Sequence, residues 1–230
     1  MRATMRRVAW LVGLSLLIAG CANKGDKAGA ADAEKKGMAA KTSFDTEKEP
    51  AITAETRFAA GKLAESQENP IGAAKQYEEA LKLKSDHVPS LYRLGVVYAQ
   101  LKQYPKAIET WKHYIKATDQ SAGGYANLGF CQELAGDFKA AEATYQKGIA
   151  KDPKNQPCRV NYGLMLARQE RMTDAVSNLR AVLTPAEVSY NLGSIHEQFG
   201  RKEQAKAEYN RALQLDPTFN DARTRLAAIQ

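Results

Sequence analysis

The side chains of this chain that are best suited to covalent or metal chemistry are three cysteines and three histidines. They are Cys21, Cys131, Cys158, His87, His113 and His196. None of the six stands at the spacing that zinc-binding cysteines and histidines keep, so no metal site is predicted. The phosphate-loop, zinc-protease and nucleophile-elbow motifs are also missing from the sequence. The sequence therefore indicates neither an enzyme nor a bound cofactor.

Cys21 stands apart because its surroundings suggest a specific reaction. Three arginines lie within the first seven residues, and an apolar run follows over residues 8–19. This run is shorter than the roughly 20 residues that cross a bilayer as a helix, but it suits the central part of a secretory signal peptide. It ends in Leu-Ile-Ala-Gly-Cys at positions 17–21, which resembles the lipobox of bacterial lipoproteins.

This resemblance implies that residues 1–20 are a signal peptide and that Cys21, once exposed by cleavage, carries a diacylglyceryl group and often a third acyl chain. Two or more chains hold a protein stably on a membrane. Ala22 follows the cysteine, where an aspartate would favour retention in the inner membrane of enteric bacteria. We therefore expect a lipid-anchored protein of the bacterial cell envelope, on the outer membrane and facing the periplasm. An ordinary cleaved signal and an uncut N-terminal anchor are the alternatives.

The other two cysteines carry no such signal. Cys131 falls on an apolar helical position and Cys158 lies near a predicted helix start. Successive helices place them at different heights, beyond the reach of a disulfide, so two separate thiols are expected. His196 is expected to serve in packing.

The charge of the chain is mild once the signal is removed. The whole sequence carries 33 lysines and arginines against 26 acids, a net charge of +7. Residues 1–20 hold three arginines and no acid, so the remainder has 30 basic residues against 26 acids, a net charge of +4. Basic and acidic residues alternate along helices instead of clustering on one face, which argues against nucleic acid as a partner. Glutamates beside lysines are expected to be solvated.

Residues 21–53 are predicted to be a disordered linker. After the cysteine they contain only three large apolar side chains, Met38, Phe44 and Ile52. So little apolar surface does not offset the entropy lost on ordering. A flexible chain of about 32 residues reaches roughly 30 Å, which would hold the following residues away from the membrane.

From residue 54 onward the sequence repeats itself. Five glycines recur at steps of 34, 34, 34 and 30 residues, namely Gly61, Gly95, Gly129, Gly163 and Gly193. An alanine follows each glycine after twelve residues, and a large side chain follows each alanine after four. The large residues are Tyr77, Trp111, Tyr145, Leu179 and Tyr209. A fixed period of this length is typical of stacked helical repeats.

The small and large residues have separate predicted roles. At the glycine a larger side chain would hold two helices apart, and the bulky residue is expected to fill the gap toward the next unit. In the third unit, Ala135-Gly136-Asp137 breaks the helical pattern, with the glycine at a position where a positive φ is favourable. Each unit is therefore predicted to be a helix–turn–helix.

These residues resemble the tetratricopeptide repeat (TPR) family. The third unit reads Tyr-Ala-Asn-Leu-Gly over 125–129, then Ala141, Tyr145, Gly148 and Pro153, which follows the family pattern. The resemblance implies an all-α, right-handed superhelical solenoid of five helix–turn–helix repeats with a concave groove. The predicted units are 54–87, 88–121, 122–155, 156–185 and 186–219, followed by a capping helix over 220–230.

The fourth unit departs from the pattern because it is four residues short. The loss falls near Leu183-Thr184-Pro185, and it predicts a shortened second helix and a local change in superhelical twist. The tail has one apolar stripe, which suits a cover for the last unit.

The groove of this family is lined mainly by the first helix of each unit. Counting from each repeat start gives the peptide-binding residues that the resemblance implies, namely Tyr92, Val96, Asn127, Phe130, Asn161, Leu164, Arg168, Tyr190 and Asn191. Glu133 and Glu197 fall on the same face. The three asparagines share one repeat position, where an amide can donate to and accept from a peptide backbone. The alternative is that asparagine is simply common in this repeat.

A protein or peptide partner is therefore expected in the groove. The layout of signal, lipobox and repeats is similar to TPR lipoproteins of Tad/Flp or type IV pilus assembly, which implies a scaffold or assembly factor for a pilus or secretin. An adaptor that positions cell-wall hydrolases or synthases is the alternative, and the chain could also form a homodimer through an exposed end helix.

Overall fold

The structure is a computed structural model that describes residues 51–229. The predicted lipidation site Cys21, the predicted signal peptide 1–20 and most of the predicted linker 21–53 lie outside the described residues. Within residues 51–229 the chain forms eleven α-helices and no strand. None of the helices in this range is both long and apolar enough to pass through a bilayer.

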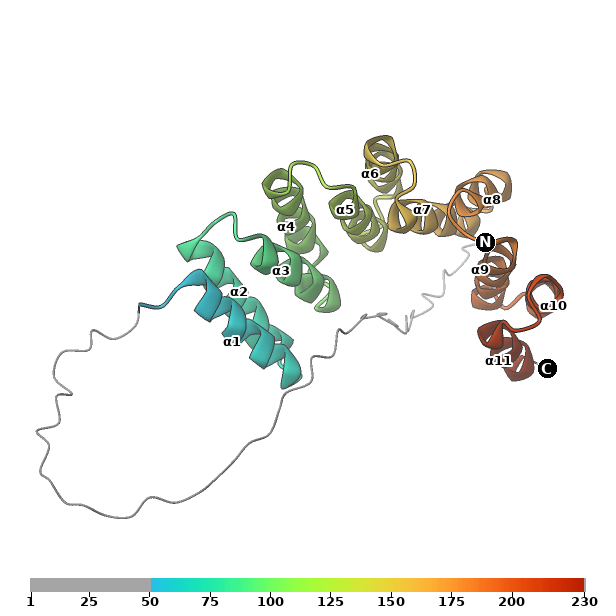
Figure 1. The fold of residues 1–230 in the computed structure, drawn as a ribbon, viewed down its shortest axis with the longest axis horizontal. Coiled ribbons are helices and arrows are strands. Elements are labelled where there is room, and N and C mark those ends of the chain that lie inside the picture. The colour runs from blue at the N-terminus through green and yellow to red at the C-terminus, as the bar shows by residue number, and fades with distance from the viewer. Residues whose placement is uncertain (1–50, 230) are drawn as a thin grey trace, which may run out of the picture. The chain divides into compact units, whose positions relative to one another are not determined.

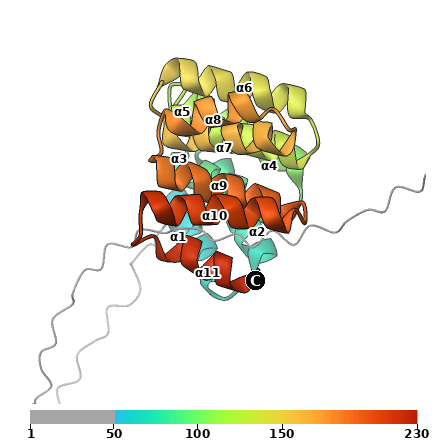
Figure 2. The same ribbon diagram turned by 90° about the vertical axis from the view of Figure 1, so that its right-hand side faces the viewer.

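Ten of the helices form five consecutive pairs. The pairs are α1 (Ala54–Ser66) with α2 (Pro70–Leu83), α3 (Val88–Gln100) with α4 (Tyr104–Ala117), α5 (Ala122–Leu134) with α6 (Phe138–Lys151), α7 (Gln156–Arg168) with α8 (Met172–Arg180), and α9 (Pro185–Gln198) with α10 (Lys202–Leu215). The single helix α11 (Asn220–Ala228) follows the last pair. The pairs stack in chain order, and residues 51–229 curve so that α3, α5, α7 and α9 line the inner side while α4, α6, α8 and α10 line the outer side (Figure 1). The turned view shows the helices of the stack lying side by side (Figure 2). The predicted all-α superhelix of five helix pairs and a final helix is confirmed.

Local sequence signals set the helix ends. The side chains of Asn69, Asp137 and Asn155 each accept a hydrogen bond from a backbone N–H in the first turn of the following helix, at 2.9, 3.0 and 3.1 Å. These contacts satisfy donors that have no partner inside a helix. Between α5 and α6, Gly136 has φ +85°, as the sequence predicts for a glycine that ends a helix.

The core repeats one contact in every unit, a glycine against a large side chain. A Cβ atom added to Gly129 would come within 2.6 Å of the Tyr145 ring, and one added to Gly95 within 2.5 Å of the Trp111 ring. The close approach of the two helices at the glycine is therefore confirmed. The ring of the large residue lies against the glycine of its own unit, because only a glycine leaves room for it there. It also reaches the next unit, as predicted, since the centroid of the Tyr145 ring lies 5.9 Å from that of the Tyr162 ring on α7.

The fourth unit is short in the way that the sequence predicts. Its second helix, α8, has 9 residues, whereas α2, α4, α6 and α10 each have 14. Pro185 opens α9, one residue before the predicted start of the fifth unit. Thr184 caps α9 through a reciprocal pair of contacts with Glu187, and a proline suits the first helical position because its missing N–H would have no partner there.

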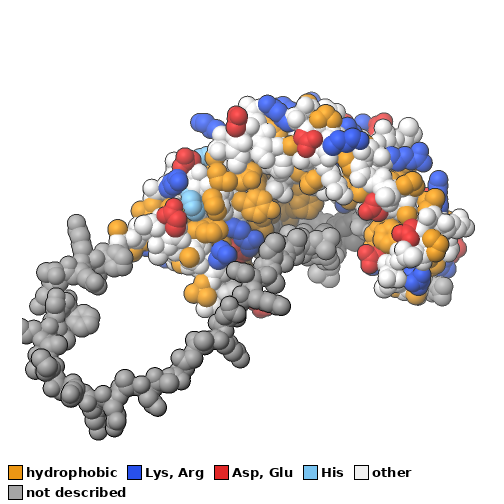
Figure 3. All heavy atoms as spheres, in the orientation of Figure 1, with side chains coloured by type: hydrophobic (Ala, Val, Ile, Leu, Met, Phe, Trp, Pro, Cys, Tyr) orange, Lys and Arg blue, Asp and Glu red, His pale blue; other side chains and the backbone are white. Residues whose placement is uncertain are grey.

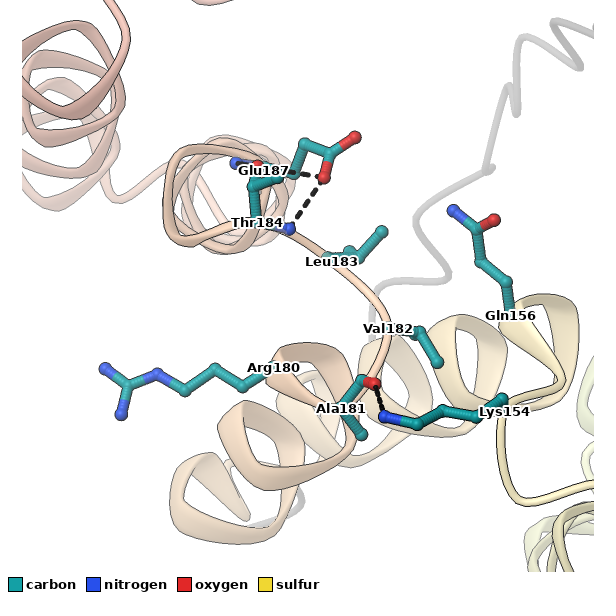
Figure 4. A pocket seen from close by; sticks show the side chains of 8 residues that line it. All are labelled: Lys154, Gln156, Arg180, Ala181, Val182, Leu183, Thr184 and Glu187. Atoms are coloured by element: carbon teal, nitrogen blue, oxygen red, sulfur yellow. Dashed lines mark hydrogen bonds between the residues drawn. The ribbon is translucent and has the colours of Figure 1, made fainter.

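The lost turn of α8 leaves an open notch of about 450 Å³ at the joint between α8 and α9 (Figure 4). Val182 and Leu183 line it, and Arg180 extends away from it. The Lys154 ammonium group crosses from the preceding loop and donates to the Ala181 carbonyl at 3.0 Å. This hydrogen bond joins the loop between α6 and α7 to the loop between α8 and α9.

The last helix covers the fifth unit. Ala222 on α11 and Ile229, which follows it, are buried, and Leu226 packs against the cluster that holds Tyr209. The predicted capping role of the tail is consistent with these contacts, although the helix ends at Ala228.

Candidate functional site

The inner side of the curve is the part of the array where side chains from successive units meet. Figure 3 shows it as a hollow with apolar side chains gathered on the wall that α3 and α5 form. Val96, Phe130 and Leu164 occupy the same repeat position on α3, α5 and α7, and all three are half-buried. Val96 and Leu164 pack against the cores of their own parts of the array. They therefore offer an apolar floor that the fold already holds in place.

Tyr92 lies on α3 at the edge of this floor and is exposed. Its ring meets the Trp111 and Tyr114 rings edge-on, with centroids 5.3 and 5.8 Å apart. Such edge-to-face contacts favour one ring orientation. Tyr92 is thus a fixed aromatic surface beside Val96, as a binding residue needs.

The three predicted asparagines do not behave alike. Asn127 and Asn161 make no side-chain hydrogen bond to any other described residue, so their amides are available to a peptide backbone. Asn191 instead donates from Nδ2 to the Glu187 carbonyl one helical turn back, at 2.8 Å. This bond uses one of the two Asn191 N–H donors, and the second N–H and the Oδ1 acceptor make no hydrogen bond within the described residues.

Two further predicted residues have structural partners. Tyr190 is half-buried between the Tyr209 and Phe219 rings, with centroids 5.7 and 5.1 Å away, so it packs at the joint between the fifth unit and α11. Arg168 forms an ion pair with Glu133. The structure therefore divides the predicted residues into a central set over α3, α5 and α7 and a pair, Tyr190 and Asn191, that contributes mainly to the fold.

The inner face also carries a repeated polar contact that the sequence reasoning missed. In the first unit, the Tyr77 hydroxyl donates to the Glu65 carboxylate, and Arg93 of the next unit donates to the same group through two nitrogens. We call such a glutamate–tyrosine–arginine set a rung. Two more rungs follow, Glu133–Tyr145–Arg168 and Glu197–Tyr209–Arg225.

A sequence signal for the rungs exists within the repeat. Each rung glutamate stands twelve residues before its tyrosine. In the second and fourth units the large residue is Trp111 or Leu179, which has no hydroxyl, and the glutamate position holds Ala99 or Ala167. The glutamate is thus present only where a hydroxyl can reach it. None of these three glutamates stands beside a lysine, so the expectation of solvated glutamates does not cover them.

Burial changes the acidity of the central rung. Withdrawal of Glu133 from water raises the pKa of its carboxyl group, although Arg168 and the Tyr145 hydroxyl act in the opposite direction. Burial, together with the nearby Glu133 charge, raises the pKa of Tyr145 far above its usual range. The Tyr145 hydroxyl therefore stays protonated and donates its hydrogen bond to the carboxylate.

The remaining reactive side chains do not assemble a centre. Cys131 and Cys158 are free and buried, as predicted, and burial raises the pKa of each thiol to about 11. A thiol with so high a pKa is a poor nucleophile at neutral pH. His87 is buried with Nδ1 at 2.8 Å from the Ser90 hydroxyl. In the described range no three histidine, cysteine, aspartate or glutamate side chains gather as a metal site would require.

The chain is similar to known proteins along most of its described length. Residues 58–122 and 134–188 match one model of the tetratricopeptide repeat family, and residues 186–219 match another. The type IV pilus assembly protein PilF of Pseudomonas aeruginosa is 26% identical over 162 residues, which are 68% of this chain and 62% of that protein. The Hsp70-Hsp90 organizing protein 3 of Arabidopsis thaliana is 30% identical over 127 residues, 54% of this chain and 22% of that protein. The chain spans only 13% of another relative, the general transcriptional corepressor ssn6 of Schizosaccharomyces pombe.

Solved structures share the fold. YrrB, described as a TPR protein with an unusual peptide-binding site, aligns with a TM-score of 0.52 and 22% identity over 75% of this chain and 91% of its own. TTC0263 of Thermus thermophilus aligns with a TM-score of 0.56 and 21% identity over 77% and 98%. The repeat spacing, the stacked helix pairs and the sequence matches agree, and the chain belongs to the tetratricopeptide repeat family.

Proposed function

We propose that this protein is a membrane-anchored, periplasmic scaffold or assembly factor for an envelope complex such as a pilus or secretin. The observation that carries the binding part of the proposal is the inner face over α3, α5 and α7. There an apolar floor lies beside Asn127 and Asn161, whose amides have no partner in the described part of the chain. Such a surface suits a peptide segment, which needs both apolar contacts and backbone hydrogen bonds.

Two lines support the envelope part of the proposal. The first is the signal-like start that ends at Cys21. The second is the similarity to PilF, a pilus assembly protein that this chain matches over 62% of its length. A lipid anchor at Cys21 and a pilus or secretin partner would both place the inner face in the cell envelope.

The binding surface is tested by a single charge on the apolar floor. Leu164→Asp places a carboxylate where a partner's apolar side chain would lie, and desolvating it without a counter-charge is unfavourable. We expect recovery of pilus or secretin subunits by co-purification from cells to fall at least about tenfold. Leu83→Asp controls for the added charge, because Leu83 is exposed at the end of α2 whereas Leu164 packs against the core. Equal recovery with both variants would show that the inner face does not bind these subunits.

The lipid anchor is tested by replacing Cys21, whose sulfur would carry the lipid. Cys21→Ser removes the atom that would carry the lipid, so the protein is expected to move from the membrane fraction to the soluble periplasmic fraction. Cell fractionation with an antibody against the array measures the change. Continued membrane association of Cys21→Ser would mean that something other than lipid at Cys21 holds the protein there.

A further inference from the structure

The three rungs of the inner face share an arrangement that determines which charge a ligand meets first. In each rung the glutamate side chain is the more buried partner and the arginine the more exposed one. The exposed fractions are 15% for Glu65 against 35% for Arg93, 9% for Glu133 against 28% for Arg168, and 25% for Glu197 against 46% for Arg225. A ligand in the hollow therefore meets guanidinium groups first and carboxylates second.

The glutamates do not cancel the arginines at the surface. Coulomb attraction falls with distance, so a ligand carboxylate in contact with a guanidinium is attracted more strongly than it is repelled by the glutamate behind it. Lys62 on α1 is exposed at the repeat position of Val96 and adds a further positive charge. Glu55 at this end is 68% exposed and opposes that charge. The helices that carry the apolar floor, α3, α5 and α7, hold three arginines, Arg93, Arg159 and Arg168, against one acid, Glu133, so this part of the array is net positive.

Each arginine keeps donors for a ligand. A guanidinium has five N–H groups. Arg93 uses Nε and Nη2 on Glu65, and Arg168 uses Nη1 on Glu133. Arg93 Nη1, and both Nε and Nη2 of Arg168, make no hydrogen bond within the described residues. Hydrogen bonds to the glutamates hold Arg93 and Arg168 in place, so a ligand does not have to order these two side chains when it binds, whereas Arg225 is held only by a 3.5 Å ion pair with Glu197.

The rungs alternate with the apolar floor. Arg93 precedes Val96 on α3, and Arg168 follows Leu164 on α7, with Phe130 and the Asn127 amide between them on α5. We propose that the inner face selects a protein segment in which acidic side chains alternate with apolar ones, and that Arg93, Arg168 and Arg225 determine this specificity. This inference rests on the proposed function and names the chemistry of the partner. The rung arginines would bind carboxylates that lie within an extended segment, and not only a carboxylate at its end.

Three fluorescent peptides of about twelve residues test the selection on the full chain. All three alternate leucine with a second residue, which is aspartate, serine or lysine. Fluorescence anisotropy is expected to show the aspartate peptide binding at least about tenfold more tightly than the serine peptide, with the lysine peptide weakest. Higher salt is expected to narrow the difference, because exposed charges are screened.

Substitutions of single arginines test whether the rungs cause the preference for the aspartate peptide. Arg168→Gln is expected to weaken the aspartate peptide about tenfold and leave the serine peptide unchanged, a split that general loss of structure would not produce. Arg211→Gln is the matched control, because Arg211 is exposed on α10 and has neither an ion pair nor a hydrogen bond in the described range. Arg168→Lys, which keeps the charge but not the fork geometry, is expected to retain part of the selectivity.

The possible failures are distinct. Equal binding of the aspartate and lysine peptides, both weakened by Leu164→Asp, would overturn the charge selection while the inner face remained a binding surface. Binding of the aspartate peptide that Leu164→Asp does not weaken would place the peptide elsewhere and overturn both this inference and the proposed binding site.

Discussion

Replacing Trp111 by alanine is expected to lower the free energy of unfolding by about 3–5 kcal/mol, the usual cost of removing a large aromatic side chain from a core. Trp111 is 1% exposed and lies against Gly95 of its own unit. It also meets the Tyr92 and Tyr114 rings edge-on, at centroid distances of 5.3 and 5.4 Å. The neighbours cannot collapse into the space of an indole without moving α3 against α4. Urea denaturation followed by circular dichroism measures the loss.

A second substitution separates volume from hydrogen bonding at this position. Trp111→Tyr introduces the residue that the first, third and fifth units carry, but Ala99 stands where those units have a glutamate. The Trp111 indole N–H is itself buried without a partner among residues 51–229, so the new hydroxyl replaces one unpaired donor by another. The smaller ring leaves part of the indole space empty, and an expected loss of about 1–3 kcal/mol follows from that volume. Adding Ala99→Glu is expected to recover part of that loss by rebuilding the glutamate–tyrosine pair. If Ala99→Glu lowers the stability of the Trp111→Tyr protein further, the explanation of the rungs is wrong.

Gly129→Val is the second large effect, with an expected loss of about 1–3 kcal/mol. Even a single Cβ atom at Gly129 would lie 2.6 Å from the Tyr145 ring, which is fully buried and cannot swing aside. The added side chain must therefore push α5 away from α6. The midpoint of thermal unfolding is expected to fall accordingly.

Gly123→Ala on the same helix is the matched control for this effect. A Cβ atom at Gly123 would meet only the Ser121 hydroxyl oxygen, at 3.8 Å. Alanine favours the helix over glycine, so the control is expected to be neutral or to stabilise by about 0.5 kcal/mol. A melting curve that shifts in the same direction for both variants would contradict the close-packing argument.

Much of the fold could be predicted because its signals are local and repeated. The recurrence of Gly61, Gly95 and Gly129 fixes the period, and the residues between them carry the turn and cap signals of each helix. The missing residues before Thr184 predicted the short α8 for the same reason. What the period could not show was which neighbour the large residue touches first, because that depends on how far apart the two helices pack.

The candidate site was predicted only in part. The inner-face positions of Val96, Phe130 and Leu164 follow from counting along the repeat, and the structure brings them to one side of the array. The hydrogen bond that occupies Asn191 and the rungs depend on side-chain conformation and on contacts between units. Residues 28 and 35 positions apart form the rungs of Arg93 and Arg168, and no local pattern encodes such distances.

The claim that the inner face binds an envelope partner is tested most directly by photo-crosslinking in cells. A photoreactive residue is placed at Phe130 on the inner wall and, separately, at Lys147, which is exposed on the outer helix α6. The account predicts that Phe130 crosslinks to a pilus or secretin subunit, that Leu164→Asp abolishes this product, and that Lys147 yields none. Crosslinks to such a subunit from Lys147 but not from Phe130 would contradict it.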